Sequence, residues 1–373
     1  MNICVVGAGN IGTYLASYMA LNEENKVWLH TSKKELFSGE IQLIEEEKNL
    51  THLVKLHKVV DNYKEGIENA DLILVTYPSF MIPRALEEIN IFIKRSAIIG
   101  VIPGFGGAEF YREKFLEKGC IFFGSQRVPS ITRLKEYGKS VYLKEKNPFM
   151  NIATFPRKKG DYVADLMTSL IHIKCNSLET YLGITLSPSN PIFHPSRLYE
   201  LFKNYEEGVS IYEKNYLFYE EWGNFASECL LKLDEELEKV TIALMGDNLK
   251  DFERIKSRFN IEKPEELTQK IRTAPGFIGI NTPMKKVEEG YIPDVESRYF
   301  IEDLQYGTCI IKGFAESLNV ETPLTDEIIE WAQKLLKKDY IRDGKLVGID
   351  SHELLTMDNM NINSREEILR YYK

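Results

Sequence analysis

"NICVVGAGNIGTYLASYMAL", residues 2 to 21, decides the fold of the first part of the chain. A short β-branched run passes directly into Gly7-Ala8-Gly9-Asn10-Ile11-Gly12, and a helical pattern follows. In this strand–turn–helix setting Gly7 permits a tight turn, Gly9 lets backbone approach a pyrophosphate, and Gly12 allows close packing of helix on sheet. The N–H groups and the positive dipole end of the helix then receive phosphates. We therefore predict a dinucleotide-binding turn, with a purely structural glycine turn as the alternative.

The second strand of such a domain is predicted in "KVWLHTSKKELF", residues 26 to 37. An acidic residue at the end of this strand would bind the ribose 2′-hydroxyl. Here Thr31, Ser32, Lys33 and Lys34 follow the strand, and no acid stands at its end. Two lysines without an acid favour a 2′-phosphate, and hence NADP(H) over NAD(H). The alternative is that both lysines belong to a solvated loop.

Further strands alternate with helical and loop segments as far as about residue 185. "ADLILVTYPSF" (70–80) and "SAIIGVIPGFGGAEF" (96–110) each read as a strand followed by a loop, and "KSVYLK" and "NIATFP" read as added strands. In open α/β sheets ligands bind beyond the carboxyl ends of the strands. We therefore expect the loops at Pro78 and at Gly104–Gly107 to flank a nicotinamide, unless their glycines serve only as turns.

The second half of the chain has a helical pattern, and the boundary falls near residues 183 to 187. Apolar residues recur at helical spacing from 217 to 245, Gly246 provides a stop, and the aromatic side of this helix is expected in the core. The polar segment 281–297 is predicted to be a mobile loop. The expected fold is α/β: a Rossmann-type dinucleotide-binding domain over 1–185, followed by an all-helical substrate and catalytic domain over 186–373.

Composition narrows the class of protein. The chain has 373 residues and a formal net charge of −9, which argues against a nucleic-acid partner. Its five cysteines form no CxxC pair, so neither a disulfide framework nor a zinc site is expected. No apolar run reaches the length of a membrane span, and the N-terminus reads as a strand. We expect a cytoplasmic protein without a metal; the oligomeric state stays open, a homodimer included.

"NPIFHPSRLY", residues 190 to 199, places His194 between Pro191 and Pro195. The two prolines fix φ and discourage helix, so a stiff turn is predicted here. Two explanations of the histidine compete: a helix entry that happens to carry it, or a base held in position for chemistry.

Four segments together resemble the opine dehydrogenase (octopine/nopaline dehydrogenase) family. They are GAGNIG, "IPGFGGAEF", "SPSNPIFHPSRLYELF" and "DVESRYFIEDLQYGTC", the last of which contains Arg298 and Asp303. The resemblance runs from the nucleotide motif to about residue 330. The N-P-x-x-H-P and R-Y-x-x-E-D elements are its specific part, although Leu304 to Gly307 lack a proline that the family often has.

The resemblance implies an enzyme that joins the amine of an amino acid to a 2-oxo acid and reduces the resulting imine with NADH or NADPH. It also implies that His194 is the acid/base, Asp303 its carboxylate partner and Arg298 an anchor for a substrate carboxylate. These roles fit the residue types, because His shuttles protons near neutral pH and Arg matches a carboxylate bidentately. From the residues alone, Asp303 is also placed to cap a helix, and Arg298 to pair with Glu302 at the i,i+4 spacing.

Two other functions stay open. One is a ketopantoate-reductase-like enzyme that reduces a 2-oxo acid without an amine. The other is a dinucleotide-binding sensor or scaffold without turnover. The amino acid, the oxo acid and the physiological direction of the reaction are not fixed by the sequence.

Overall fold

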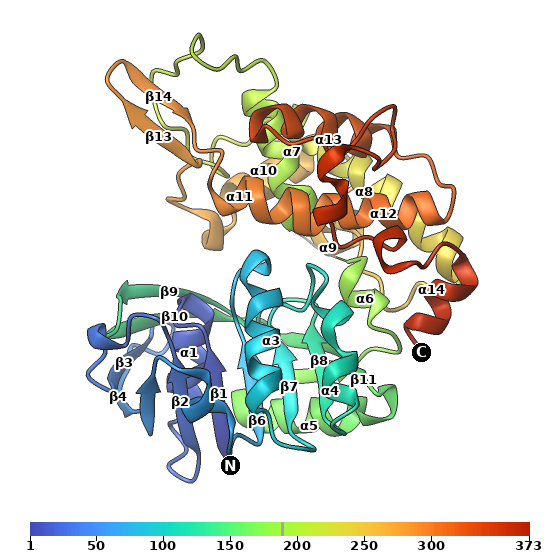
Figure 1. Ribbon diagram of the computed structural model, residues 1–373. Helices are drawn as coiled ribbons and strands as arrows, with labels where there is room; N and C mark the ends of the chain where they lie inside the picture. Colours follow the sequence, from blue (N-terminus) through green and yellow to red (C-terminus); the bar gives the residue numbers. More distant parts are fainter. Residues whose placement is uncertain (188–189) are drawn as a thin grey trace. The chain divides into compact units, whose positions relative to one another are not determined.

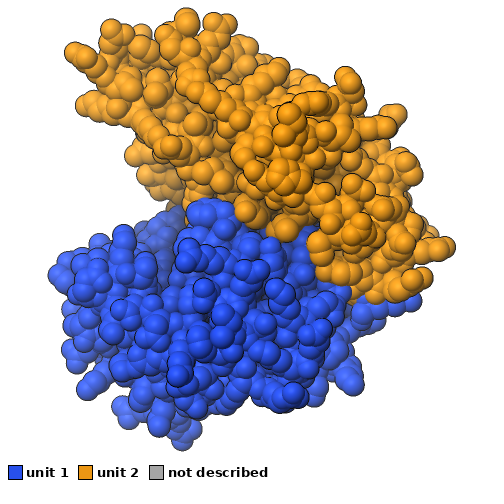
Figure 2. Space-filling view, in the orientation of Figure 1, with its two compact units in different colours: residues 1–185, 373 blue, residues 186–372 orange. Residues whose placement is uncertain are grey.

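A computed structural model describes residues 1–187 and 190–373. The chain separates into two compact units, Met1–Thr185 with Lys373, and Leu186–Tyr372 (Figure 2). Pro188 and Ser189, which belong to the segment that carries His194 in the sequence, lie outside the described residues.

The first unit is built on an eight-stranded sheet (Figure 1). Its strands in spatial order are β12 (Lys174–Ser177), β11 (Phe149–Phe155), β8 (Ile121–Ser125), β7 (Ile98–Val101), β6 (Leu72–Val75), β1 (Asn2–Val6), β2 (Lys26–His30) and β5 (Lys58–Val60). All neighbours pair in parallel except β11 and β8, which pair antiparallel. The predicted Rossmann-type α/β sheet is confirmed.

Helices cover both faces of this sheet. They are α1 (Asn10–Met19), α2 (Tyr63–Ile67), α3 (Ile82–Phe92), α4 (Glu113–Leu116), α5 (Gly160–Ile171) and α6 (Leu182–Thr185). Side chains of successive strand residues alternate between faces, so Ile3 and Val5 of β1 join the core formed with α1 and α5. Cys4 points the other way, against Gly66 of α2.

A second, four-stranded sheet in the first unit was not predicted. Its order is β4 (Leu50–Lys55), β3 (Glu40–Glu45), β10 (Ser140–Lys146) and β9 (Ser130–Glu136). Ile41 and Leu43 of β3 and Val141 of β10 pack in the same core as Leu15 of α1, so α1 has apolar partners in both sheets. The strand predicted at "KSVYLK" is β10 of this sheet, and "NIATFP" lies in β11 of the large one.

The second unit is helical apart from one hairpin. Its helices are α7 (Asn190–Phe202), α8 (Asn224–Met245), α9 (Ile255–Phe259), α10 (Pro264–Thr273), α11 (Arg298–Phe300), the π-helical segment η6 (Ile301–Thr308), α12 (Cys309–Ser317), α13 (Pro323–Leu336) and α14 (Arg365–Tyr371). The mobile loop expected over 281–297 is wrong, because β13 (Met284–Val287) and β14 (Gly290–Pro293) pair there as a hairpin.

The long helix predicted over 217–245 begins only at Asn224. Glu200 of α7 accepts hydrogen bonds from the backbone N–H groups of Gly223 and Ala226, and thereby caps the start of α8. A Cβ at residue 223 would lie 1.9 Å from the Glu200 carboxylate. Residues 217–222 therefore form a separate turn, in which Phe218 and Trp222 are fully buried.

Within residues 1–187 and 190–373, no helix is long and apolar enough to cross a membrane. No group of three or more His, Cys, Asp or Glu residues there is placed to hold a metal ion.

Candidate active site

The glycine turn between β1 and α1 has the steric demands that a dinucleotide cradle needs. Gly7 has φ +109°, in the region that side chains other than glycine rarely adopt. A Cβ on Gly12 would lie 1.8 Å from the Gly7 carbonyl oxygen. A side chain at residue 12 would therefore push the helix away from the strand, and one at residue 7 would strain the backbone of the turn and meet Thr76.

Gly9 differs from both, because a Cβ added there would meet no atom within 4 Å. It precedes the first turn of α1, whose leading N–H groups have no partner inside the helix. The open side at Gly9 and these N–H groups fit the pyrophosphate of a nicotinamide dinucleotide. The Asn10 carboxamide oxygen accepts a hydrogen bond of 2.8 Å from the Leu134 N–H, and the half-buried Ile11 packs against the core.

The end of β2 carries the residues predicted to select the cofactor. The buried Thr31 hydroxyl contacts the Tyr137 hydroxyl at 3.0 Å and accepts a hydrogen bond from the Lys33 N–H. Ser32 and Lys33 are exposed, and the Lys33 ammonium lies 5.6 Å from the centre of the Tyr137 ring. Lys34 instead forms a 3.7 Å ion pair with Asp61.

His30, the last residue of β2, adds no positive charge at neutral pH. Burial lowers the pKa of its imidazole to about 4, although Asp61 opposes this shift. Its Nδ1 lies 3.2 Å from the Tyr77 hydroxyl. The positive charge at this end of the strand is therefore that of the lysines.

Pro78 lies in the loop after β6, the strand beside β1 on the side away from β2. The connections from β1 and from β6 leave in opposite directions at this point of the sheet, which is where ligands bind in doubly wound folds. Pro78 and the glycine turn thus follow adjacent strand ends.

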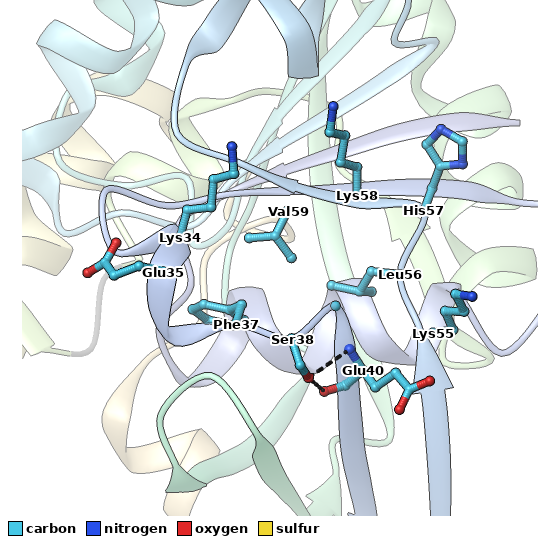
Figure 3. Close-up of a pocket in the computed structure, with 11 residues that line it drawn as sticks. Lys34, Glu35, Phe37, Ser38, Glu40, Lys55, Leu56, His57, Lys58 and Val59 are labelled. Carbon is cyan, nitrogen blue, oxygen red and sulfur yellow. Dashed lines mark hydrogen bonds between the residues drawn. The ribbon is translucent and has the colours of Figure 1, made fainter.

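A hollow of about 600 Å³ lies elsewhere in the first unit, between residues 34–40 and 55–59 (Figure 3). The amino groups of Lys34 and Lys58 extend in the same direction, above Val59. Of the residues considered for cofactor choice only Lys34 lines this hollow, and no residue of the glycine turn does. It is therefore separate from the glycine cradle.

His194 lies in a helix, so the predicted stiff turn is wrong. Pro191 stands in the first turn of α7, where a missing N–H costs nothing, but Pro195 lies inside the helix. Pro195 has no N–H to donate to the Pro191 carbonyl four residues earlier. That carbonyl instead accepts a 2.9 Å hydrogen bond from the Thr308 hydroxyl of η6. The replacement partner makes the internal proline tolerable and joins α7 to η6.

The same two helices bring His194 and Asp303 together. The His194 Nδ1 and an Asp303 carboxylate oxygen are 2.6 Å apart, and the two residues are 3% and 1% exposed. Asp303 lies inside η6, so it does not cap a helix start at Leu304. Because a carboxylate has no proton to give, Nδ1–H donates to Asp303 and Nε2 of the neutral ring becomes an acceptor.

Tyr219 occupies the other side of the ring, a position that no sequence pattern indicated. Its hydroxyl lies 2.9 Å from His194 Nε2, to which it can donate. The ring of Tyr219 stacks on Phe277 at 4.1 Å between centroids. Arg197 fixes the turn before it, since its Nε donates to the Phe218 carbonyl at 3.0 Å. The helix predicted over 217–245 did not suggest a contact between Tyr219 and His194. The contact depends on the turn over 217–222, which exists because α8 begins only at Asn224.

Arg298 lies next to this cluster but is not buried in it. Its Nε is 3.4 Å from a Glu302 carboxylate oxygen, the i,i+4 pair considered from the sequence, and its side chain is 56% exposed. Its neighbour Tyr299 packs against His194 with 4.1 Å between ring centroids. The guanidinium therefore keeps donors on the solvent side.

Comparison with known proteins adds independent information. Residues 177–336 match the family described as NAD/NADP octopine/nopaline dehydrogenase, alpha-helical domain. Tauropine dehydrogenase of Arabella iricolor is 28% identical over 347 residues, which cover 86% of this chain and 85% of that protein. Octopine dehydrogenase of Pecten maximus is 26% identical over 396 residues, which cover 99% and 98%. Residues 177–336, which include His194 and Asp303, are therefore similar to the helical domain of the opine dehydrogenases.

The fold of the family is shared over the whole chain. A solved structure of octopine dehydrogenase with NADH and L-arginine has a TM-score of 0.83 and 23% identity, and the match covers 100% of this chain and 98% of that one. Residues 3–143 alone match the family described as Ketopantoate reductase PanE/ApbA. The protein described by this sequence is an NAD(P)-dependent dehydrogenase, with a nucleotide-binding unit followed by a helical unit.

Proposed function

We propose that this protein catalyses the NAD(P)H-dependent reductive condensation of an amino acid with a 2-oxo acid, and so forms a CH–NH bond. The observation that carries the proposal is the buried His194–Asp303 pair, whose second imidazole nitrogen faces a phenol and not a nucleophile. Relatives named octopine, tauropine and opine dehydrogenase support the reaction class. Octopine dehydrogenase structures with L-arginine, agmatine and pyruvate support an amine and an oxo acid as substrates.

His194 is the proposed acid/base. Condensation of an amine with a 2-oxo acid gives a carbinolamine, which becomes an imine when its hydroxyl leaves as water. The hydroxyl must be protonated as it leaves, and an imidazole does this near neutral pH. Asp303 holds Nδ1–H, so it fixes the tautomer and stabilises the imidazolium. When bound, the nicotinamide cofactor supplies the hydride that reduces the imine carbon.

Tyr219 is proposed to carry the proton between His194 and the substrate. Asp303 holds Nδ1, so every proton that His194 exchanges with a substrate passes through Nε2. Nε2 is in hydrogen-bonding contact with the Tyr219 hydroxyl, and both groups are nearly inaccessible to solvent. A phenol accepts a proton from imidazolium on one side while it gives its own on the other, so it transfers the proton without a change in net charge.

Arg298 is proposed to bind a substrate carboxylate. Its guanidinium has five N–H donors, and its ion pair with Glu302 is formed through Nε, so the terminal nitrogens are the ones proposed to bind the substrate. A planar fork binds a carboxylate through two parallel hydrogen bonds. The neighbouring Tyr299 ring against His194 would place such a carboxylate close to the acid/base.

The glycine turn with Asn10, Ile11 and Pro78 is proposed to hold the dinucleotide, and the residues after β2 to select it. Lys33 is exposed and forms no ion pair with a carboxylate of the described residues, whereas Lys34 pairs with Asp61. A 2′-phosphate beside Ser32 and Lys33 would gain a charge-assisted contact, so NADP(H) is preferred over NAD(H).

The reaction class is tested by a screen of amino acids against 2-oxo acids, with NADPH and NADH oxidation followed by absorbance and products identified by mass. A secondary amine that forms only when both substrates are present is expected. A ketopantoate-reductase-like function, which the match over residues 3–143 favours for the first unit alone, predicts a hydroxy acid formed without an amine. Nucleotide binding without turnover on any pair would instead indicate a sensor.

A further inference from the structure

A hollow in the second unit lies on the far side of η6 from His194. Its volume is about 1000 Å³, within the range of small-molecule sites, and it is bounded by the β13–β14 hairpin, residues 205–211, η6 and the end of α13. The hairpin, labelled β13 and β14 in Figure 1, is fixed to the chain before it. Tyr212 and Tyr291 exchange two backbone hydrogen bonds of 2.9 and 2.8 Å, so this wall is formed in advance.

The walls of the hollow are mostly aliphatic. They include Ile211, Val287, Ile292, Val295, Leu335 and Leu336. Ile211 is 45% exposed, so the apolar surface is open to a ligand and not covered by the protein itself. An occupant that removes this surface from water gains free energy in proportion to the apolar area buried.

One of the lysines at the hollow has no carboxylate partner. The charged residues that line it are Lys285, Lys334, Lys337, Lys338, Glu207 and Glu296. Lys285 pairs with Glu296 at 2.6 Å and Asp294 at 3.2 Å, Lys337 with Glu207 at 3.0 Å, and Lys338 with Glu353 at 2.6 Å and Asp350 at 3.8 Å. Lys334 pairs with no carboxylate of residues 1–187 and 190–373, and it is exposed. An aliphatic wall with an ammonium left over matches a molecule with an apolar chain and one negative group.

η6 connects this hollow to the acid/base pair. Ile301 and Gln305 line the hollow, and residues four apart share one face of a helix. Asp303 is two residues from each, so its side chain leaves from the other face, where it binds His194. The segment is π-helical, and Tyr306 within it has non-helical torsions (φ −96°, ψ 15°). Such segments adjust more easily than regular α-helix and recur at functional sites.

We propose that this hollow is a second ligand site, which binds a carboxylate with an apolar chain and adjusts turnover by moving η6 against His194. The regulatory half rests on the proposed function, whereas the binding half does not. A ligand that pushes on Ile301 and Gln305 changes the position of Asp303 and hence the orientation of the imidazole.

Sodium decanoate is the probe, titrated into the full chain by calorimetry, with decanol as its uncharged counterpart. Two variants address the hollow, Lys334→Glu for the charge and Ile211→Asp for the wall, and both residues are exposed enough to leave folding intact. Lys232→Glu, on the exposed side of α8, is the matched control. We expect one decanoate per chain, about tenfold weaker binding in both hollow variants, and no change in the control.

Decanoate binding that is equal in all four proteins, or decanol binding as tight as decanoate, would overturn the site. Light scattering that shows a dimer of the wild-type chain but a monomer of Ile211→Asp would also overturn it, because a second copy would then cover the hollow. For the regulatory half, decanoate is expected to change kcat in both wild type and Lys334→Glu, with about tenfold more decanoate needed for the half-maximal change in the variant. Saturable binding without any change in wild-type kcat would refute that half alone, and the calorimetry stands whatever the reaction is.

Discussion

The glycine turn after β1 depends on backbone geometry, whereas the His194 cluster, which consists of His194, Asp303 and Tyr219, depends on side chains. The turn lies within six consecutive residues and acts through backbone, since Gly7 supplies a positive φ and Gly9 an open approach. The cluster joins residues 25 and 109 positions from His194, and it acts through buried side chains. The first site should therefore respond to the size of a substituent, and the second to its chemistry.

His194→Asn tests the chemical half of this comparison and should have the largest effect. Loss of a positioned acid/base lowers turnover by about 10³-fold. The glycine turn is untouched, so the Kd for NADPH, measured by fluorescence, should stay within about twofold of wild type, less than 0.5 kcal/mol. Near-native imine reduction by this variant would remove His194 from the mechanism.

Gly12→Ala and Gly9→Ala test the steric half as a pair. The added Cβ at residue 12 meets the Gly7 carbonyl oxygen at 1.8 Å, so overpacking should cost about 3 kcal/mol, seen as a lower midpoint of urea unfolding. The same Cβ at residue 9 meets nothing in the protein. We expect Gly9→Ala to unfold like wild type and to bind NADPH about tenfold more weakly, since the methyl group would face the pyrophosphate in the proposed binding mode. Equal unfolding midpoints of the two variants would contradict the steric account.

Tyr219→Phe should have an intermediate effect. It keeps the ring that stacks on Phe277 but removes the hydroxyl at His194 Nε2. A less direct proton path should lower kcat about tenfold and alter the solvent deuterium isotope effect, with KM for both substrates little changed. If Tyr219 only packed against the imidazole, the isotope effect would stay at its wild-type value.

Lys33→Glu should have the smallest effect, because the residue is exposed and screened by salt. We expect the KM for NADPH to rise about fivefold while that for NADH changes less, since only NADPH carries the 2′-phosphate. Lys34→Glu serves as the control, because Lys34 is paired with Asp61. If the KM values for NADPH and NADH changed equally, the residues after β2 would have no part in the choice of cofactor.

The same contrast explains what the sequence could predict. The β1 strand, the glycines and the start of α1 are local, so their spacing was sufficient to place them. The α7 helix was missed because Pro195 leaves the Pro191 carbonyl without its helical donor. The replacement donor is the Thr308 hydroxyl, which is distant in sequence. The turn that carries Tyr219 was missed because helical spacing ran on through it, and the Glu200 cap that ends the pattern comes from another helix. Residues whose partners are far along the chain carry no local signal.

The central claim is that His194 and Asp303 act as one unit, and a double-mutant cycle tests it most directly. Turnover of one amine–oxo acid pair is measured for wild type, His194→Asn, Asp303→Asn and the double variant, with NADPH binding as the check on folding. If Asp303 acts through the imidazole, its replacement slows wild type strongly but leaves His194→Asn no slower than before. Losses that multiply independently in the double variant would contradict the account.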